Sequence, residues 1–101
     1  MDQPTLKFLP EAVAEARAAR QWYKVRSPAA ADAFVAELDA AIQRILEAPD
    51  RFASYLHGTQ RCLLRRFPYL VVFRQAEQVV EVIAIAHGRR RPGYWKKRAM
   101  E

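Results

Sequence analysis

The chain has 101 residues, 51% of them hydrophobic, which predicts a single globular domain over residues 1–101 and argues against a disordered chain. Its single cysteine, Cys62, excludes an internal disulfide, and no surrounding His or Cys spacing indicates zinc, so we expect no metal and no cofactor. The formal net charge is +6. The N-terminus lacks a signal-peptide pattern, and the apolar runs fall far below the roughly 18 residues of a membrane span, so we expect a cytoplasmic protein.

The first part of the chain predicts a short strand and two helices. Residues 5–9 form a β-capable run that ends at Pro10, which suits the first position of a helix because its missing N–H would have no partner there. Apolar residues then recur at helical spacing to about Arg26. Ser27 can cap a second helix that starts at Pro28 and stops before Pro49. We expect an antiparallel helical hairpin.

The second part of the chain predicts strands. Residues 50–59 carry no sustained period and indicate a connection, whereas residues 60–67, 69–74 and 79–86 are rich in β-branched and aromatic residues and indicate an antiparallel meander. The near-continuous apolar character of residues 79–86 predicts burial on both faces, with helices over one of them. The fold class is therefore α+β, with the hairpin packed in two layers on an antiparallel sheet of four strands.

The positive charge lies mostly in the second half of the chain. Residues 1–50 carry 6 Lys and Arg against 8 Asp and Glu, whereas residues 51–101 carry 11 against 3. A clustered basic region attracts phosphates or acidic protein segments. The tail after the last strand, AHGRRRPGYWKKR, combines such cations with two large rings, so an acidic partner is expected there.

Several residues of this region are candidates for binding. Arginine forks bind phosphate or carboxylate in a bidentate way, which favours Arg89 and Arg90. His87 has two open interpretations, a structural histidine at a strand end and a direct functional contact. Tyr94 and Trp95 either contact a partner or, as rings more often do, pack against the sheet.

Arg61 and Arg65 are four residues apart on the first strand of the meander, so we expect them to share one face, either as a basic surface or as a solvated one. Cys62 alternates with Arg61 and should face the helices. Arg98 belongs to a basic end that is either solvated or in contact with phosphate.

The β–α–α–β–β–β order, the FPY sequence at residues 67–69 and the late H-x-R-R-x-P-x-Y-W arrangement resemble the ParE branch of the ParE/RelE toxin superfamily. The resemblance covers nearly the whole chain and implies a RelE/ParE-like fold. It also implies a type II toxin that is neutralised by a cognate antitoxin and forms a hetero-oligomer with it. The antitoxin would bind the hairpin and sheet, with candidate contacts at Trp22, Phe34, Leu38 and Ile42.

Two activities occur in the superfamily. ParE-type toxins are non-enzymatic poisons of DNA gyrase, which the resemblance in FPY, H-x-R-R-x-P and YW favours, with target contacts at Arg61, Arg65, His87, Arg89, Arg90, Tyr94, Trp95 and Arg98. RelE-type toxins are endoribonucleases that cut mRNA on the ribosome, and in that alternative the catalytic candidates are His87, Arg61, Arg65 and Arg89. Leu63 and Leu70 stand where the ribonuclease pattern has Lys and Arg, and leucine can neither move a proton nor stabilise a phosphate. A plain nucleic-acid-binding module is a third hypothesis, ranked last because neither helix is basic.

Overall fold

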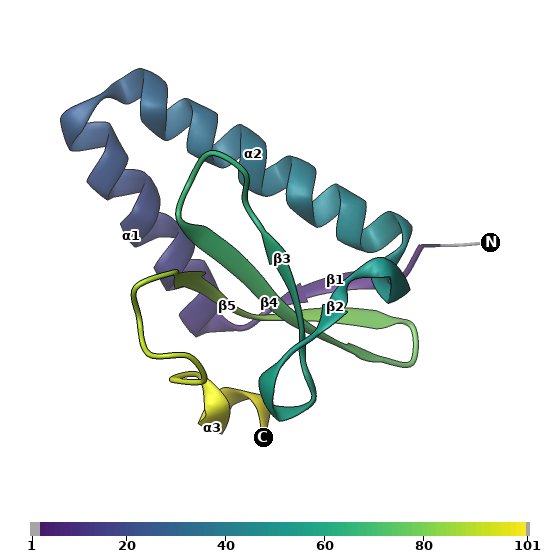
Figure 1. Ribbon diagram of the computed structural model, residues 1–101. Helices are drawn as coiled ribbons and strands as arrows, with labels where there is room; N and C mark the ends of the chain where they lie inside the picture. Colours follow the sequence, from purple (N-terminus) through teal and green to yellow (C-terminus); the bar gives the residue numbers. More distant parts are fainter. Residues whose placement is uncertain (1–2, 101) are drawn as a thin grey trace.

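A computed structural model of the chain describes residues 3–100. The chain forms a mixed sheet, a long helical hairpin and a short C-terminal helix (Figure 1). In chain order the elements are β1 Thr5–Phe8, α1 Pro10–Arg26, α2 Pro28–Glu47, the 3-10 turn η1 Pro49–Arg51, β2 Ala53–Ser54, the 3-10 turn η2 Leu56–Gly58, β3 Gln60–Leu63, β4 Tyr69–Ala76, β5 Val79–His87 and α3 Lys96–Ala99.

The helical hairpin begins and ends where the prolines and the cap predict. Pro10 and Pro28 open the two helices, and the Ser27 side chain between them accepts the backbone N–H of Ala30 at 3.2 Å. That hydroxyl satisfies a donor that would otherwise lack a partner in the first turn of α2. Pro49 then follows the last turn of α2, so both predicted helices are confirmed.

The sheet differs from the expectation in two respects. It has five strands in the order β1-β5-β4-β3-β2, and β1 pairs parallel to β5, whereas the other pairs are antiparallel. The extra strand, Ala53–Ser54, lies inside the segment predicted as a connection. Parallel pairing is possible because no short turn joins β1 to β5; the hairpin and the other strands lie between them in the chain.

The first strand of the meander is shorter than predicted. β3 ends at Leu63, so Arg65 lies in the turn that leads to β4 and does not share a strand face with Arg61. A carboxylate oxygen of Glu37 on α2 accepts the backbone N–H groups of Arg65 and Arg66 and holds this turn against the helix. The predicted pairing of Arg61 and Arg65 on one face is therefore wrong.

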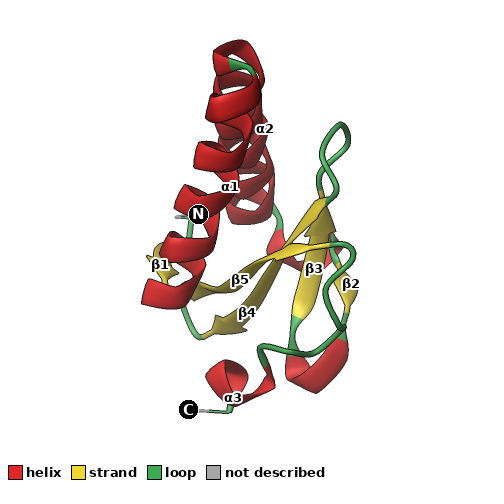
Figure 2. Cartoon of the chain, turned by 90° about the vertical axis from the view of Figure 1, so that its left-hand side faces the viewer, coloured by secondary structure: helices red, strands yellow, loops and turns green. Residues whose placement is uncertain are grey.

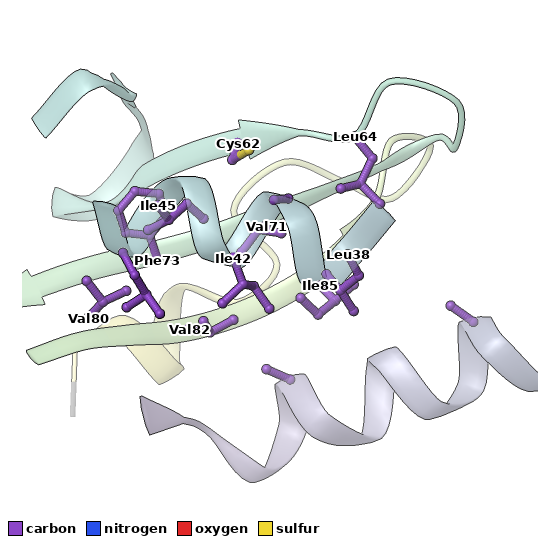
Figure 3. Packing of buried hydrophobic residues seen from close by; sticks show 14 of the residues in the cluster. Leu38, Ile42, Ile45, Cys62, Leu64, Val71, Phe73, Val80, Val82 and Ile85 are labelled. Atoms are coloured by element: carbon purple, nitrogen blue, oxygen red, sulfur yellow. The ribbon is translucent and has the colours of Figure 1, made fainter. Parts of the chain in front are cut away.

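One hydrophobic core lies between the hairpin and the sheet (Figure 3). The apolar stripe of α2, with Leu38, Ile42 and Ile45, packs on alternate residues of the strands, among them Val71 and Phe73. Side chains two apart on a strand point the same way, which is why one face of β4 enters this core. Cys62 is buried in it and faces the helices, as predicted.

A second apolar cluster covers the opposite face of the sheet, which the two-layer expectation left open. The C-terminal segment, residues 88–100, folds back so that α3 lies on the far side of the sheet from the hairpin (Figure 2). Trp95 is 1% exposed and packs with the other members of this cluster, which are Leu70, Val72, Ile83, Ala84, Ala86 and Ala99. Burial of β5 on both faces is thereby confirmed.

Candidate target-binding surface

The C-terminal segment is fixed at both ends. Near its start, the backbone N–H of Gly88 donates to the carbonyl of Pro68 at 2.7 Å, and near its end Arg74 of β4 donates to the carbonyl of Ala99. Arg74 also pairs with the buried carboxylate of Glu81 at 2.6 Å, so its guanidinium links α3 to the middle of the sheet. The cations of this segment are therefore carried on an ordered backbone.

Glu15 of α1 is the central anchor of this segment. One carboxylate oxygen accepts the Tyr94 hydroxyl at 2.5 Å and lies 3.6 Å from Nη1 of Arg90. The other accepts Nη1 of Arg98 at 2.9 Å and the backbone N–H of Ile85 at 3.1 Å. The same side chain thus caps the edge of β5 beyond the end of β1 and ties the tail to the hairpin.

The environment of this cluster shifts the pKa of two of its members. Burial raises the pKa of the Tyr94 hydroxyl well above its ordinary value, and the hydrogen bond to Glu15 raises it further because ionised Tyr94 would face a carboxylate. Burial lowers the pKa of Arg98, but its hydrogen bond and charge attraction to Glu15 outweigh that effect and raise it overall. Tyr94 therefore stays a neutral donor between two guanidinium groups, with Arg90 at 3.6 Å and Arg98 at 5.3 Å from its ring centroid.

The remaining cations of the segment face solvent. Arg89 and Arg91 are exposed on either side of Arg90, and their side chains have no hydrogen-bond or ion-pair partner within residues 3–100. Lys96 and Lys97 are exposed on α3. The segment therefore offers unpaired positive charge at the end of β5, which suits binding of an anionic group.

His87 closes β5 at the edge of this surface. Its Nδ1 accepts the backbone N–H of Arg89 at 3.0 Å, which places the proton of the neutral ring on Nε2. Its ring meets the edge of Tyr69 at a centroid distance of 5.0 Å. His87 therefore ties the strand end to the loop while it remains half-buried at the surface.

The structure brings together only part of the predicted target-binding set. His87, Arg89, Arg90, Tyr94 and Arg98 gather around the end of β5 and Glu15. The other three predicted residues, Arg61, Arg65 and Trp95, do not join this exposed surface. Trp95 is buried against the sheet, as its packing interpretation predicted, so it is not an exposed target contact, and Arg65 lies against α2.

Arg61 lies on the same side of the sheet as Trp95 but is engaged by a ring. Its guanidinium lies 4.8 Å from the ring centroid of Tyr55, which in turn packs 5.8 Å from Trp95. Next to it on β3, Leu63 is 60% exposed and is paired in register with Leu70. The strand positions that were compared with the ribonuclease pattern thus hold one arginine, Arg61, and two leucines, Leu63 and Leu70.

Glu15 was not predicted from the sequence as part of this site. Its neighbours give a signal, because Ala12 and Ala19, three residues before and four after it, are both buried. Residues at that spacing share a helix face, so Glu15 points toward the sheet, and the small alanines let the helix approach closely.

A second candidate site is an apolar groove between β1, α1 and α2. It encloses about 550 Å³ and is lined by Leu6, Phe8, Val13, Leu38, Ile42 and Leu46, with polar residues at its rim. Leu6 is 38% exposed, and β1 is an edge strand whose outer side has no neighbour in the sheet. Two of the predicted antitoxin contacts, Leu38 and Ile42, line this groove.

The other two predicted antitoxin contacts lie elsewhere. Phe34 is fully buried in the core, so its ring is not available to a partner in this structure. Trp22 is 51% exposed near the C-terminal end of α1 and lines a different hollow, next to His87 and Arg90. The predicted antitoxin residues therefore do not form one surface.

Two further properties bear on function. Within the described part of the chain, no three His, Cys, Asp or Glu side chains lie together as ligands of a metal ion would. No helix among residues 3–100 has the length and apolar character needed to span a bilayer.

The hairpin packed on a mixed sheet, with a basic segment folded over the other face, defines an α+β domain with apolar clusters on both faces of its sheet. A solved structure described as the chromosomal ParDE TA system from P. aeruginosa has a similar fold, with a TM-score of 0.74 and 21% identity over 84% of this chain and 96% of that chain. The family model "ParE toxin of type II toxin-antitoxin system, parDE" matches residues 6–92. The chain belongs to this family of ParE toxins.

Relatives with closer sequences are known from Mycobacterium tuberculosis. The Toxin ParE2 proteins of strains CDC 1551 / Oshkosh and ATCC 25618 / H37Rv are each 33% identical to this chain over 55 residues. The aligned region covers 54% of this chain, and the chain spans about half the length of these relatives, 52% of each.

Proposed function

We propose that this chain acts in the cytoplasm as the toxin of a type II pair, as a single toxin domain that inhibits bacterial growth by poisoning DNA gyrase without covalent chemistry of its own. Membership in the ParE toxin family over residues 6–92 is the observation that carries the proposal. The ordered cationic surface at the end of β5 supports it, because Arg89 and Arg90 are placed to bind an acidic or nucleic-acid-bearing target.

The alternative, ribosome-dependent cleavage of mRNA, has less support from the site. Such cleavage needs groups that move protons and cations that stabilise the phosphate, all within reach of one scissile bond. Of its candidates, Arg65 is held against α2, and Arg61 is stacked on Tyr55. Beside Arg61, the Leu63–Leu70 pair presents apolar groups where that chemistry would need polar ones.

The target is tested with purified gyrase and supercoiled plasmid. The proposal predicts that adding the toxin makes ATP-dependent gyrase accumulate cleaved plasmid, and that mRNA on translating ribosomes stays intact. Cut mRNA on ribosomes together with unaffected supercoiling would replace the poison with the ribonuclease.

We also propose that a cognate antitoxin neutralises the chain by laying an apolar segment into the groove between β1, α1 and α2. The apolar floor of the groove and the free edge of β1 support this, because a bound segment can bury side chains and pair with the strand. The experiment replaces Leu6, which is at the groove, with glutamate, and uses Thr5→Glu on the same strand as the matched control. Leu6→Glu should weaken antitoxin binding at least about tenfold in titration calorimetry, as expected when a charge enters an apolar interface. Equal weakening by both variants would exclude this groove.

A further inference from the structure

A hollow of about 400 Å³ lies between α1 and the end of the β4–β5 pair. Its walls combine aromatic rings with an imidazole and a guanidinium group, and they include Trp22, Tyr23, Pro68, Tyr69, His87 and Arg90. This hollow is distinct from the proposed antitoxin groove. It shares His87 and Arg90 with the cationic surface of the gyrase proposal, which assigns no role to the aromatic wall of the hollow.

Trp22 is the most accessible ring of this hollow. Its side chain is 51% exposed, and Tyr23 meets it edge-on at a centroid distance of 5.0 Å. The guanidinium of Arg26 lies 3.7 Å from its ring centroid. Arg26 therefore covers one face of the indole, and the part of the ring that stays exposed is where a base can stack, as in proteins that bind single strands.

Arg90 lines the hollow, and its two neighbours in the chain add positive charge near it, which favours an anion. Arg89 and Arg91 flank Arg90, and their side chains have no partner in residues 3–100. Glu15 also lines the hollow, but both of its oxygens are already bound, one by Tyr94 and Arg90 and the other by Arg98 and Ile85. Its charge is therefore matched within the protein, and the free charge at this end is positive.

We propose that this hollow binds an unpaired nucleobase of a single-stranded nucleic acid, with the base stacked at Trp22 and the adjoining phosphates on Arg89 and Arg91. Aromatic walls beside unpaired arginines fit a ligand that has a flat apolar face and a negative backbone, which an acidic peptide does not offer. His87 supports the assignment, because its Nδ1 is occupied and its Nε2 is left as the donor of the neutral ring. The inference goes beyond gyrase poisoning and does not depend on which enzyme is the target.

The test uses the full chain and two probes of equal charge, a 12-nucleotide oligothymidylate and the same length of abasic sugar–phosphate. Oligothymidylate should quench the fluorescence of the exposed Trp22, while the buried Trp95 is shielded from it. The abasic strand should bind at least about fivefold more weakly, since stacking of one base contributes about 1–3 kcal/mol. In Arg89→Ala/Arg91→Ala, the slope of log affinity against log salt should fall by about 1.4, because two phosphate contacts are lost.

Three variants at two positions of α1 locate the base. Trp22→Ala should lower oligothymidylate affinity about tenfold, Trp22→Phe should keep most of it, and Val25→Ala should leave it unchanged, because Val25 is 72% exposed and lies outside the hollow. Equal affinity for the two probes, or parental affinity of Trp22→Ala, would overturn the proposal. Loss of antitoxin capture by Trp22→Ala with unchanged oligonucleotide binding would also overturn it and assign the hollow to a protein. The quenching is measured on the parent chain, so that arm holds even where a variant fails to fold.

Discussion

Replacing Glu15 with glutamine tests how the basic segment is held. The substitution keeps the shape of the side chain but removes the charge that Arg98 meets at 2.9 Å and Arg90 at 3.6 Å. A hydrogen bond to a charged group contributes about 1.5–3 kcal/mol, and a buried ion left without its partner costs roughly 3–5 kcal/mol. The side chains of Glu15 and Arg98 are 15% and 19% exposed, so solvent screens the pair in part. We expect a loss of about 2–3 kcal/mol in the free energy of unfolding.

Urea denaturation and thermal unfolding measure this loss. For a domain of this size, about 2–3 kcal/mol lowers Tm by roughly 10–20 °C. Trypsin should also cut faster after Arg89 and Arg90, because the segment that carries them loses its anchor on α1. Glu47→Gln, at an exposed position of α2, removes the same charge and should stay within about 0.5 kcal/mol of the parent. A Glu15→Gln protein as stable as that control would refute the anchoring role of Glu15.

Three more outcomes follow from the contacts. In Glu15→Gln the pKa of Tyr94 should fall, as measured by absorbance titration at 295 nm. In the parent, Tyr94 stays protonated in the folded state above about pH 10, where it ionises in the unfolded chain, so its contribution to the free energy of unfolding should be complete below about pH 10 and be lost as the pH rises further. A stability profile that stays flat in this range would contradict the burial of Tyr94. Burial raises the pKa of the Cys62 thiol, so a thiol reagent at pH 8 should react at least about tenfold more slowly with the folded than with the unfolded chain, and equal rates would contradict this. Gly93→Ala should lower the free energy of unfolding by about 1 kcal/mol more than Gly58→Ala. Both glycines have positive φ, but only at Gly93 would an added Cβ lie 3.1 Å from Nε2 of His57. Equal urea midpoints for the two variants would exclude this contact.

The helical hairpin was predictable because the residues at the ends of each helix determine where it begins and ends. Two apolar periods begin and end at residues that act through the backbone of their own turn, namely Pro10, Ser27, Pro28 and Pro49. Burial of β5 was predictable for a similar reason, since a strand with almost no polar residue must be covered on both faces.

The features that were missed depend on contacts between distant residues. β3 ends at Leu63 because Glu37, on α2, accepts the backbone N–H groups of Arg65 and Arg66 that follow it. Nothing in the sequence of residues 60–67 indicates that a carboxylate from α2 binds there. The two-residue β2 exists only through its pairing with Arg61 and Gln60. The second layer over the sheet likewise required knowing that the tail turns back.

The candidate site was half predictable. The cations at the end of β5 stand next to each other in the sequence, so their clustering needed no fold. Which of them is free did not follow from composition, because Glu15 lies more than 70 residues away from Arg90 and Arg98 and engages both. Among residues 3–100, the free cations of this cluster are therefore Arg89 and Arg91, with Arg90 partly engaged.

Gyrase cleavage by a variant of the cationic surface tests the account most directly. Arg89→Ala/Arg90→Ala removes two charges at the end of β5, and Arg20→Ala/Arg51→Ala removes two from exposed positions on α1 and η1. The account predicts that the parent and the Arg20/Arg51 variant make gyrase accumulate cleaved plasmid, and that the Arg89/Arg90 variant does not, although it still binds the antitoxin. A folded Arg89/Arg90 variant that traps cleaved plasmid as efficiently as the parent would contradict it.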